Sequence, residues 1–177
     1  MPDSSQSHKR TIRSFVIRSG RMTPSQKKFF EAHRKKWALP FNEDCTLYDF
    51  TQIYGNNNPV VLEIGFGMGD SLLQMAKNHP EQNFLGIEVH QAGVGRLLRL
   101  VDEHDIDNIR VICHDAVEVL KHCIPQHSLQ RVNIFFPDPW HKQKHRKRRL
   151  IQNDFLTLLH DRISPNGLLH IATDWLP

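Results

Sequence analysis

The stretch from Val60 to Asp70, with the sequence VVLEIGFGMGD, constrains the fold more than any other part of the chain. A run of aliphatic residues leads into three glycines at alternate positions, and residues 71–77 then carry apolar side chains at helical spacing. A strand, a glycine turn and a helix open an α/β sheet whose ligand lies beyond the strand's carboxyl end. Glycine suits such a turn because the backbone bends sharply there and a ligand must come close to it.

The spacing of the glycines and the residue before them favour one ligand class over another. A dinucleotide site has G-x-G-x-x-G and places pyrophosphate on a helix N-terminus, whereas Gly65, Gly67 and Gly69 follow G-x-G-x-G. Glu63 stands two residues before the first glycine, where a carboxylate would repel pyrophosphate but could receive an ammonium group. The sequence therefore favours S-adenosylmethionine, which carries an ammonium and a sulfonium, over NAD. A glycine turn with a solvated glutamate is the alternative interpretation.

Two further acids follow later apolar segments. Residues 83–87 form a second short strand that ends before Glu88, and residues 109–113 form a third that is followed by His114 and Asp115. An acid at the tip of the second strand can accept from both ribose hydroxyls, as in the dinucleotide folds. A carboxylate after the third strand can accept from the amino group of adenine. Each acid alone is typical of a solvated strand end, but three at successive strand tips predict a nucleoside site.

Size and composition bound the class of protein. The 177 residues are 39% hydrophobic, which predicts one domain with its own core. No apolar run approaches the ~20 residues that span a bilayer, and the polar N-terminus lacks a signal peptide's apolar segment. Cys45, Cys113 and Cys123 are odd in number and form no motif, so they suit a reducing compartment. We therefore expect a cytoplasmic protein without a membrane partner.

The net charge of +4 is unevenly distributed along the chain. Residues 1–40 hold ten Lys and Arg against two acids, for a net charge of +8, so residues 41–177 sum to −4. Within that acidic remainder, residues 142–149 alone contribute +6. Two basic segments on an acidic body indicate a polyanionic partner, and nucleic acid is the polyanion that this pattern favours. A solvated basic face is the alternative interpretation of either segment.

Helix and strand patterns divide the chain into two parts. Residues 23–26 make a helix start, with a threonine cap, a proline for the first turn and a capping-box glutamine, and the helix is expected to end near Trp37. We interpret residues 1–40 as a flexible basic arm with this helix, and residues 41–177 as one domain. In that domain strand and helix alternate, which predicts an α/β fold with a doubly wound, mostly parallel sheet. The predicted strands are 60–65, 84–88, 109–113, 131–136 and 168–173, and the predicted helices are 71–78, 91–103, 115–122 and 150–163.

The fourth predicted strand, residues 131–136, is followed by Pro-Asp-Pro-Trp. The ligand should lie over this edge, so Asp138, held between two prolines, is expected to face the transferable methyl group. Trp140 offers a flat surface for a base. His141 and His145 lack an obvious third metal ligand, so we expect no metal site. The next segment is a phosphate-binding loop by composition, and its cations are Lys142, Lys144, Arg146, Lys147, Arg148 and Arg149.

Taken together, these segments resemble the tRNA (guanine-N7-)-methyltransferase family over nearly the whole chain. The matching sequences are RMTPSQ at 21–26, EIGFGMG at 63–69, GIEVH at 86–90, FPDPWHK at 136–142, KRRL at 147–150 and TDW at 173–175. The resemblance implies a Rossmann-like class I methyltransferase fold, S-adenosylmethionine as methyl donor, and the variable-loop guanine at position 46 of tRNA as acceptor. Whether the protein is a monomer or a homodimer stays open.

The resemblance also assigns roles to single residues. The positions that match cofactor-binding residues are Glu63, Glu88, Asp115 and Asp138, of which Asp138 is also the expected catalytic acid. Lys142 and Asp174 match substrate-binding positions. The family continues past the fifth strand into a final hairpin with a Thr-x-x-Glu segment, so this chain is expected to lack those strands and to expose an edge of its sheet.

Other functions stay open from the sequence alone. An amino-group methyltransferase is one alternative, because Pro-Asp-Pro-Trp distantly resembles an Asn/Asp-Pro-Pro-aromatic motif, and an NAD-dependent dehydrogenase is the second enzyme alternative. A tRNA-binding remnant without catalytic activity is the alternative from a different class.

Overall fold

A computed structural model describes residues 14–15, 24–41 and 47–175 of the chain. Its strands are β1 (Val60–Ile64), β2 (Asn83–Ile87), β3 (Ile109–Ile112), β4 (Leu129–Phe135) and β5 (Ile163–Ala172). Its helices are α1 (Pro24–Trp37), α2 (Phe50–Tyr54), α3 (Asp70–Asn78), α4 (Gln91–Glu103), α5 (Ala116–His122), the 3-10 helix η1 (Gln143–Arg148) and α6 (Asn153–Arg162).

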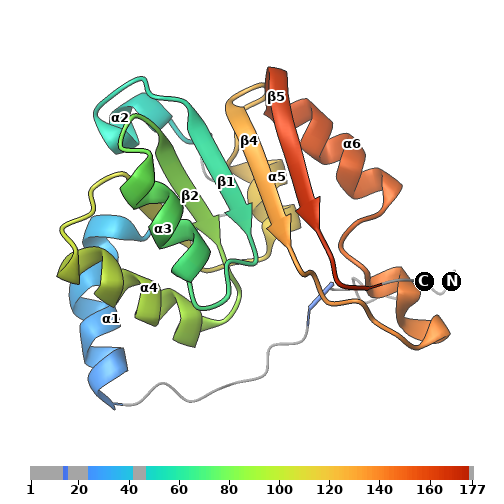
Figure 1. Cartoon of the computed structure of the whole chain (residues 1–177), viewed down its shortest axis with the longest axis horizontal. Helices are drawn as coiled ribbons and strands as arrows, with labels where there is room; N and C mark the ends of the chain where they lie inside the picture. Colours follow the sequence, from blue (N-terminus) through green and yellow to red (C-terminus); the bar gives the residue numbers. More distant parts are fainter. Residues whose placement is uncertain (1–13, 16–23, 42–46, 176–177) are drawn as a thin grey trace, which may run out of the picture.

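The five strands form one parallel sheet in the order β3-β2-β1-β4-β5 (Figure 1). The chain runs from β1 outward through β2 to β3, and then returns to place β4 on the other side of β1. This reversal creates a switch point between β1 and β4, where ligands of open α/β sheets bind at the carboxyl ends of the strands. The predicted α/β fold with a doubly wound sheet is confirmed, and all five described strands are parallel.

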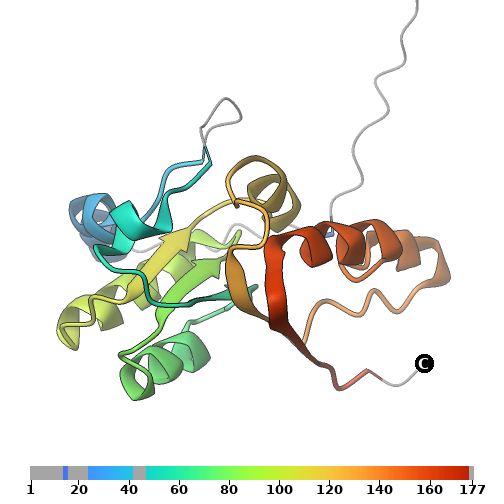
Figure 2. The same cartoon turned by 90° about the horizontal axis from the view of Figure 1, so that it is seen from above.

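Each face of the sheet carries its own core because side chains alternate along the strands. On one face, Val61 of β1 belongs to a buried cluster with residues of α3 and α4 and with Trp37 of α1. On the other face, Leu62 belongs to a cluster with residues of α5 and α6. Figure 2 shows α3 and α5 on opposite sides of the sheet. Strands that are buried on both faces read as continuous aliphatic runs, which is why they could be located from the sequence.

The largest differences from the predicted boundaries lie at the starts of β5 and α6. β5 begins at Ile163 rather than at 168, because Ile163 pairs with Leu129 before the register shifts and Leu168 pairs with Arg131. Asn166 lies within this shift with φ +65°, a left-handed value that asparagine tolerates. The basic stretch expected as a loop contains η1, and α6 starts at Asn153 rather than 150.

The predicted N-terminal helix is present as α1, and it packs against α4. Trp37 at its end is 2% exposed, and His33 lies 3.6 Å from Asp102 of α4. The basic side chains of α1 are exposed: Lys27, Lys28, Arg34, Lys35 and Lys36. The predicted threonine cap and the arginines of the expected arm at 10, 13, 18 and 21 lie outside the described residues. The division of the chain at residue 40 stays a prediction.

The expected exposed edge lies at β5, which pairs with β4 alone among the described strands. Leu168, Leu169 and Ile171 are 59%, 38% and 37% exposed. An edge strand with apolar side chains and unpaired backbone groups favours association with other chains.

Candidate cofactor and substrate site

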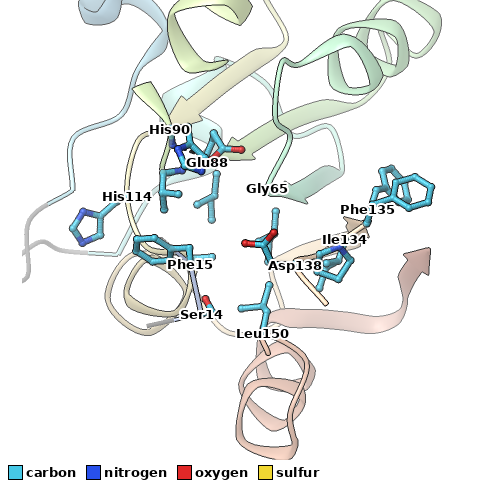
Figure 3. A pocket seen from close by; sticks show the side chains of 16 residues that line it. Ser14, Phe15, Gly65, Glu88, His90, His114, Ile134, Phe135, Asp138 and Leu150 are labelled. Carbon is cyan, nitrogen blue, oxygen red and sulfur yellow. Dashed lines mark hydrogen bonds between the residues drawn. The ribbon is translucent and has the colours of Figure 1, made fainter. Parts of the chain in front are cut away.

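The switch point carries a cavity of about 200 Å³ at the carboxyl ends of the strands. Its walls come from the segments that follow β1, β2, β3 and β4, together with Ser14 and Phe15. Figure 3 shows Phe15 and His114 on one side of this cavity and Asp138 beside Gly65 on the other. The predicted site residues that line the cavity are Gly65, Glu88 and Asp138.

The glycine loop, residues 65–69, has the backbone that its composition predicts. Gly65, Gly67 and Gly69 have φ values of +74°, +57° and +85°, which strongly favour glycine. The N–H of Gly65 donates to the carbonyl oxygen of Ile87 at 2.8 Å, so the loop starts beside the end of β2. Gly69 is the N-cap of α3 and supplies no side-chain cap. The loop therefore depends on contacts from neighbouring elements for its shape.

The first turn of α4 approaches the glycine loop so closely that it has no room for a side chain. A Cβ atom on Gly93 would lie 2.0 Å from the carbonyl oxygen of Gly67, a backbone atom. We expect Gly93→Ala to lower the free energy of unfolding by about 1–3 kcal/mol and to weaken cofactor binding. Thermal unfolding and titration with S-adenosylhomocysteine would measure both effects. Wild-type values for both would show that the loop absorbs the added methyl group without changing shape.

Glu88 holds the glycine loop from the end of β2. Its Oε2 accepts from the N–H of Gly67 at 2.8 Å, and its Oε1 accepts from the N–H groups of Val89 and His90 at 2.7 and 2.9 Å. The side chain is only 5% exposed and lines the cavity. A carboxylate has about four acceptor positions, so these three amides leave one for a ligand hydroxyl. The structure shows that Glu88 holds the glycine loop. Its role in binding ribose stays a prediction.

Glu63 lies at the same end of the sheet but does not line the cavity. It pairs in register with Gly86 and Asn133, and its side chain is on the α3 face with 3% exposure. Its Oε2 is buried and has no hydrogen-bond partner among the described residues. Burial raises the pKa of Glu63 to about 7. A buried carboxyl with an unpaired oxygen needs a donor, which an ammonium group or a water molecule would supply.

Asp115 lies beside a second, larger cavity of about 730 Å³. Its Oδ1 accepts from the N–H groups of Val117 and Glu118 at 2.8 and 3.3 Å, so it caps α5. Phe15 and His114 line both cavities, which therefore share a wall. Of the four predicted acids, Glu88 and Asp138 thus line the first cavity and Asp115 lines the second, whereas Glu63 lines neither.

Asp138 is exposed at the end of β4 and lines the first cavity. Pro137 and Pro139 flank it, which restricts the backbone on both sides. Phe136 just before this turn has φ +50°, an uncommon value for a residue other than glycine. The N–H of Phe136 donates to the carbonyl oxygen of Ala172 at 2.8 Å, so β5 fixes the start of the turn. These backbone constraints fix the position of Asp138 at the end of β4.

Arg148 covers one face of the Trp140 ring, so the predicted stacking of a base on Trp140 would have to use the other face. The guanidinium carbon of Arg148 lies 4.1 Å from the centroid of its ring, and His145 meets it edge-on at 5.6 Å. The indole Nε1 donates to the carbonyl oxygen of Ser14 at 2.8 Å. Trp140 therefore joins the segment that follows β4 to the N-terminal residues that line the cavity.

The six cations of the basic segment, residues 142–149, divide into two groups. Arg148 and Arg149 are partly buried, and the Nε of Arg149 donates to the carbonyl oxygen of Pro139 at 2.8 Å. Partial desolvation and the neighbouring cations lower the pKa of His145, which disfavours a further positive charge at this place. The cations with exposed side chains are Lys142, Lys144, Arg146 and Lys147.

The end of β5 returns to the basic segment. Trp175 lies 4.4 Å from the ring of His141 and 6.0 Å from the guanidinium of Arg149. Asp174, next to Trp175, is exposed. The structure therefore brings the two stretches with predicted substrate-binding residues side by side, although they are not adjacent in the sequence.

Several residues that line the first cavity had no predicted role. His90 and His114 directly follow strand ends, so their place at this edge could have been inferred from the strand pattern. Ser14 and Phe15 carry no such signal, because they reach the cavity from a segment far away in the chain. Leu150 lines the cavity from the stretch before α6, which was predicted as part of that helix.

Metal sites, membrane-spanning helices and thiols are described for residues 14–15, 24–41 and 47–175. These ranges contain no group of three or more His, Cys, Asp or Glu that could hold a metal ion. No helix in them is long and apolar enough to cross a membrane. Cys113 is a free thiol, and Cys45 lies outside the described residues.

Known proteins resemble this chain in sequence and in fold. A family model described as "Putative methyltransferase" matches residues 57–177. A tRNA (guanine-N(7)-)-methyltransferase of Histophilus somni is 51% identical over 95% of this chain and 66% of its own length. The Vibrio vulnificus protein of that name is 52% identical over 94% of this chain and 69% of its own length. A 30S ribosomal A1408 methyltransferase from an uncultured bacterium shares the fold, with TM-score 0.52 and 18% identity over 71% of this chain and 61% of that chain.

The parallel sheet and its switch point define a Rossmann-like α/β fold, which the A1408 methyltransferase shares. The family model identifies the class of protein as a methyltransferase. The sequence matches are more specific than the fold. The chain belongs to the tRNA (guanine-N(7)-)-methyltransferase family, and it spans 66% of the length of the Histophilus relative.

Proposed function

We propose that this chain transfers a methyl group from S-adenosylmethionine to nitrogen 7 of guanine in tRNA, at variable-loop position 46. The cavity at the switch point carries this proposal, because Glu88 and Asp138 line it and its described lining contains no Lys or Arg. The cations nearby, Lys121, Lys147, Arg148 and Arg149, line the adjoining cavity instead. The lining of the first cavity suits a cationic ligand without phosphate and disfavours the pyrophosphate of a dinucleotide. The names of the relatives support guanine N7 of tRNA as the acceptor.

The residues present fit S-adenosylmethionine at three places. The free acceptor position of Glu88 suits a ribose hydroxyl, and Asp115 beside the adjoining cavity suits the adenine amino group. The glycine loop, with Gly65, Gly67 and Gly69, suits the amino-acid end, where the unpaired oxygen of Glu63 would receive an ammonium group directly or through water. The bound cofactor supplies an electrophilic methyl group on its sulfonium.

Methyl transfer to guanine N7 requires that the protein align the two reactants and stabilise the positive charge that develops. Guanine N7 has a free lone pair and no proton to lose, so no general base is required. The site must hold that lone pair in line with the methyl group and the sulfur. Positive charge arrives on the purine during transfer, and the Asp138 carboxylate at the cavity wall is placed to stabilise it electrostatically.

Transfer of labelled methyl groups to tRNA, followed by mass spectrometry of the nucleosides, tests the proposal. We expect 7-methylguanosine at position 46. A methylated exocyclic amino group would instead support the amino-group methyltransferase. Salt-sensitive tRNA binding with cofactor binding but no transfer would support a non-catalytic protein, and saturable NAD binding would support a dehydrogenase.

The exposed cations of the basic segment are expected to bind the tRNA backbone. In the variant with Lys144→Ala and Lys147→Ala, tRNA affinity should fall, and the slope of log affinity against log salt should decrease by roughly 0.7–0.9 for each phosphate that a lysine no longer neutralises. Filter binding at several salt concentrations would measure it. The matched control is Lys77→Ala, since Lys77 is exposed in the last turn of α3, away from the glycine loop. A wild-type slope in the double variant would exclude these lysines from the interface.

A reducing setting such as the cytoplasm is part of the proposal. It is supported by the free thiol of Cys113 and by the tRNA substrate that the relatives' names give.

A further inference from the structure

Arg96 of α4 contacts the glycine loop and the helix that follows it at the same time. Its Nη1 donates to the carbonyl oxygen of Met68 at 2.6 Å and to Oδ2 of Asp70 at 2.9 Å. Its Nη2 donates to Oδ1 of Asp70 at 2.8 Å, which completes a bidentate pair. One guanidinium thus joins α4, the loop carbonyl and the first residue of α3.

Backbone hydrogen bonds and the buried Phe66 side chain anchor much of the glycine loop: Gly65 donates to the carbonyl oxygen of Ile87, and Gly69 donates to that of Phe66. Gly65, Gly67 and Gly69 lack side chains that could fix the loop, and glycine backbones have the most conformational freedom to lose. Two side chains bond to the middle of the loop, Glu88 at the Gly67 amide and Arg96 at the Met68 carbonyl. Glu88 reaches the loop from the end of β2 and Arg96 reaches it from α4, so the two side chains hold neighbouring peptide groups. Removing one of them would loosen the loop whose first residue, Gly65, lines the cavity.

We propose that Arg96 is a positioning residue that holds the glycine loop in its cofactor-binding shape through the Met68 carbonyl and Asp70. This inference rests on the proposed function, since it concerns the same cofactor. A loop that spends only part of its time in the binding shape lowers the apparent affinity by that fraction. Arg96 does not line either of the two cavities at the sheet edge, so it acts through the loop and not by touching the ligand.

An ordinary surface ion pair would have no such effect, and α4 provides one for comparison. Arg99 pairs with Glu103 at 2.6 Å within the same helix, four residues apart, and both side chains are about half exposed. Exposed pairs of this kind contribute little to stability. Exposure does not separate the two pairs, since Arg96 is 28% and its partner Asp70 is 71% exposed. The difference is that Arg96 reaches another element and also bonds to the Met68 carbonyl, so its loss should change the loop and not only the helix surface.

Binding of S-adenosylhomocysteine to the full chain, measured by calorimetry, would test the proposal with Arg96→Ala and the control Arg99→Ala. We expect Arg96→Ala to weaken binding about tenfold or more, as a charge-assisted contact of this kind allows, and Arg99→Ala to match the wild type. Hydrogen exchange should show faster exchange of the Gly67 and Gly69 amides in Arg96→Ala alone. Arg96→Lys should restore part of the affinity, because a lysine can still reach an acceptor but lacks the bidentate fork.

The outcomes for Arg96 and for the cofactor are distinguishable. Wild-type affinity and wild-type exchange in Arg96→Ala would overturn the role of Arg96 while leaving the proposed function intact. Absence of binding in the wild-type chain would instead count against the proposed cofactor, and the exchange rates of the loop amides would still decide whether Arg96 holds the loop. Equal losses in Arg96→Ala and Arg99→Ala, with equal falls in melting temperature, would assign Arg96 a general stabilising role and overturn its positioning role.

Discussion

Replacing Asp138 with alanine is expected to lower methyl transfer to tRNA by at least about 100-fold while the affinity for S-adenosylmethionine stays largely intact. The expected loss is large because Asp138 lines the cavity at the end of β4, and its charge opposes the positive charge that arrives on guanine. The expected retention of affinity follows from the other groups placed to hold the cofactor, the glycine loop and Glu88 among them. Single-turnover transfer and calorimetric titration would measure the two quantities separately.

A second substitution at this position separates the effect of charge from the effect of side-chain size, and a control tests an acid elsewhere. Asp138→Asn keeps the size of the side chain but removes its charge, so an electrostatic role predicts a loss close to that of Asp138→Ala. The control is Asp107→Ala, since Asp107 is an exposed acid before β3, away from the carboxyl ends of the strands. Turnover at the wild-type rate in Asp138→Ala would remove this residue from the mechanism.

The fold followed closely from the sequence because its strands are short aliphatic runs between turn residues. Each core strand is buried on both faces, so its residues had to be apolar at nearly every position. The start of β5 could not be predicted in the same way. Residues 164–167, Ser-Pro-Asn-Gly, have the composition of a turn, yet they lie within the strand where its pairing with β4 shifts in register. Local composition does not show that a neighbouring strand tolerates such a shift.

The candidate site followed from the sequence only in part. The rule that strand ends meet at one edge placed Glu88, Asp115 and Asp138 near each other. Glu63 differs because it lies within β1, and the alternation of side chains puts it on the α3 face with Val61. Phe15 could not be placed at all, since its position depends on contacts across most of the chain. Local patterns locate groups on strands, but only the packed structure shows which of them share a cavity.

Replacing Glu63 with glutamine is expected to stabilise the free protein near pH 8 while it weakens cofactor binding. Burial raises the pKa of Glu63 to about 7 from its ordinary value of 4.5. Between these values the folded chain holds a proton that the unfolded chain has lost, so the free energy of unfolding falls as pH rises through this window. The total loss corresponds to about 3 kcal/mol once the carboxyl is fully ionised. Glutamine cannot ionise and should escape it, as denaturant unfolding at pH 5 and pH 8 would show.

The affinity for the cofactor should rise with pH, whereas the free energy of unfolding falls. A role in cofactor binding would account for a destabilising acid within β1. The Oε2 of Glu63 is buried without a partner among the described residues, so an ammonium group brought near it would favour the ionised carboxylate. Wild-type affinity should therefore rise as pH increases through about 7, with uptake of the cofactor releasing a proton. In Glu63→Gln the affinity should be lower and lack this rise, whereas Glu103→Gln, which removes a half-exposed carboxyl on α4, should behave as the wild type in both assays. If the pH dependence of binding were the same with and without the Glu63 carboxyl, Glu63 would have no contact with the cofactor's charge, and its burial would serve the fold alone.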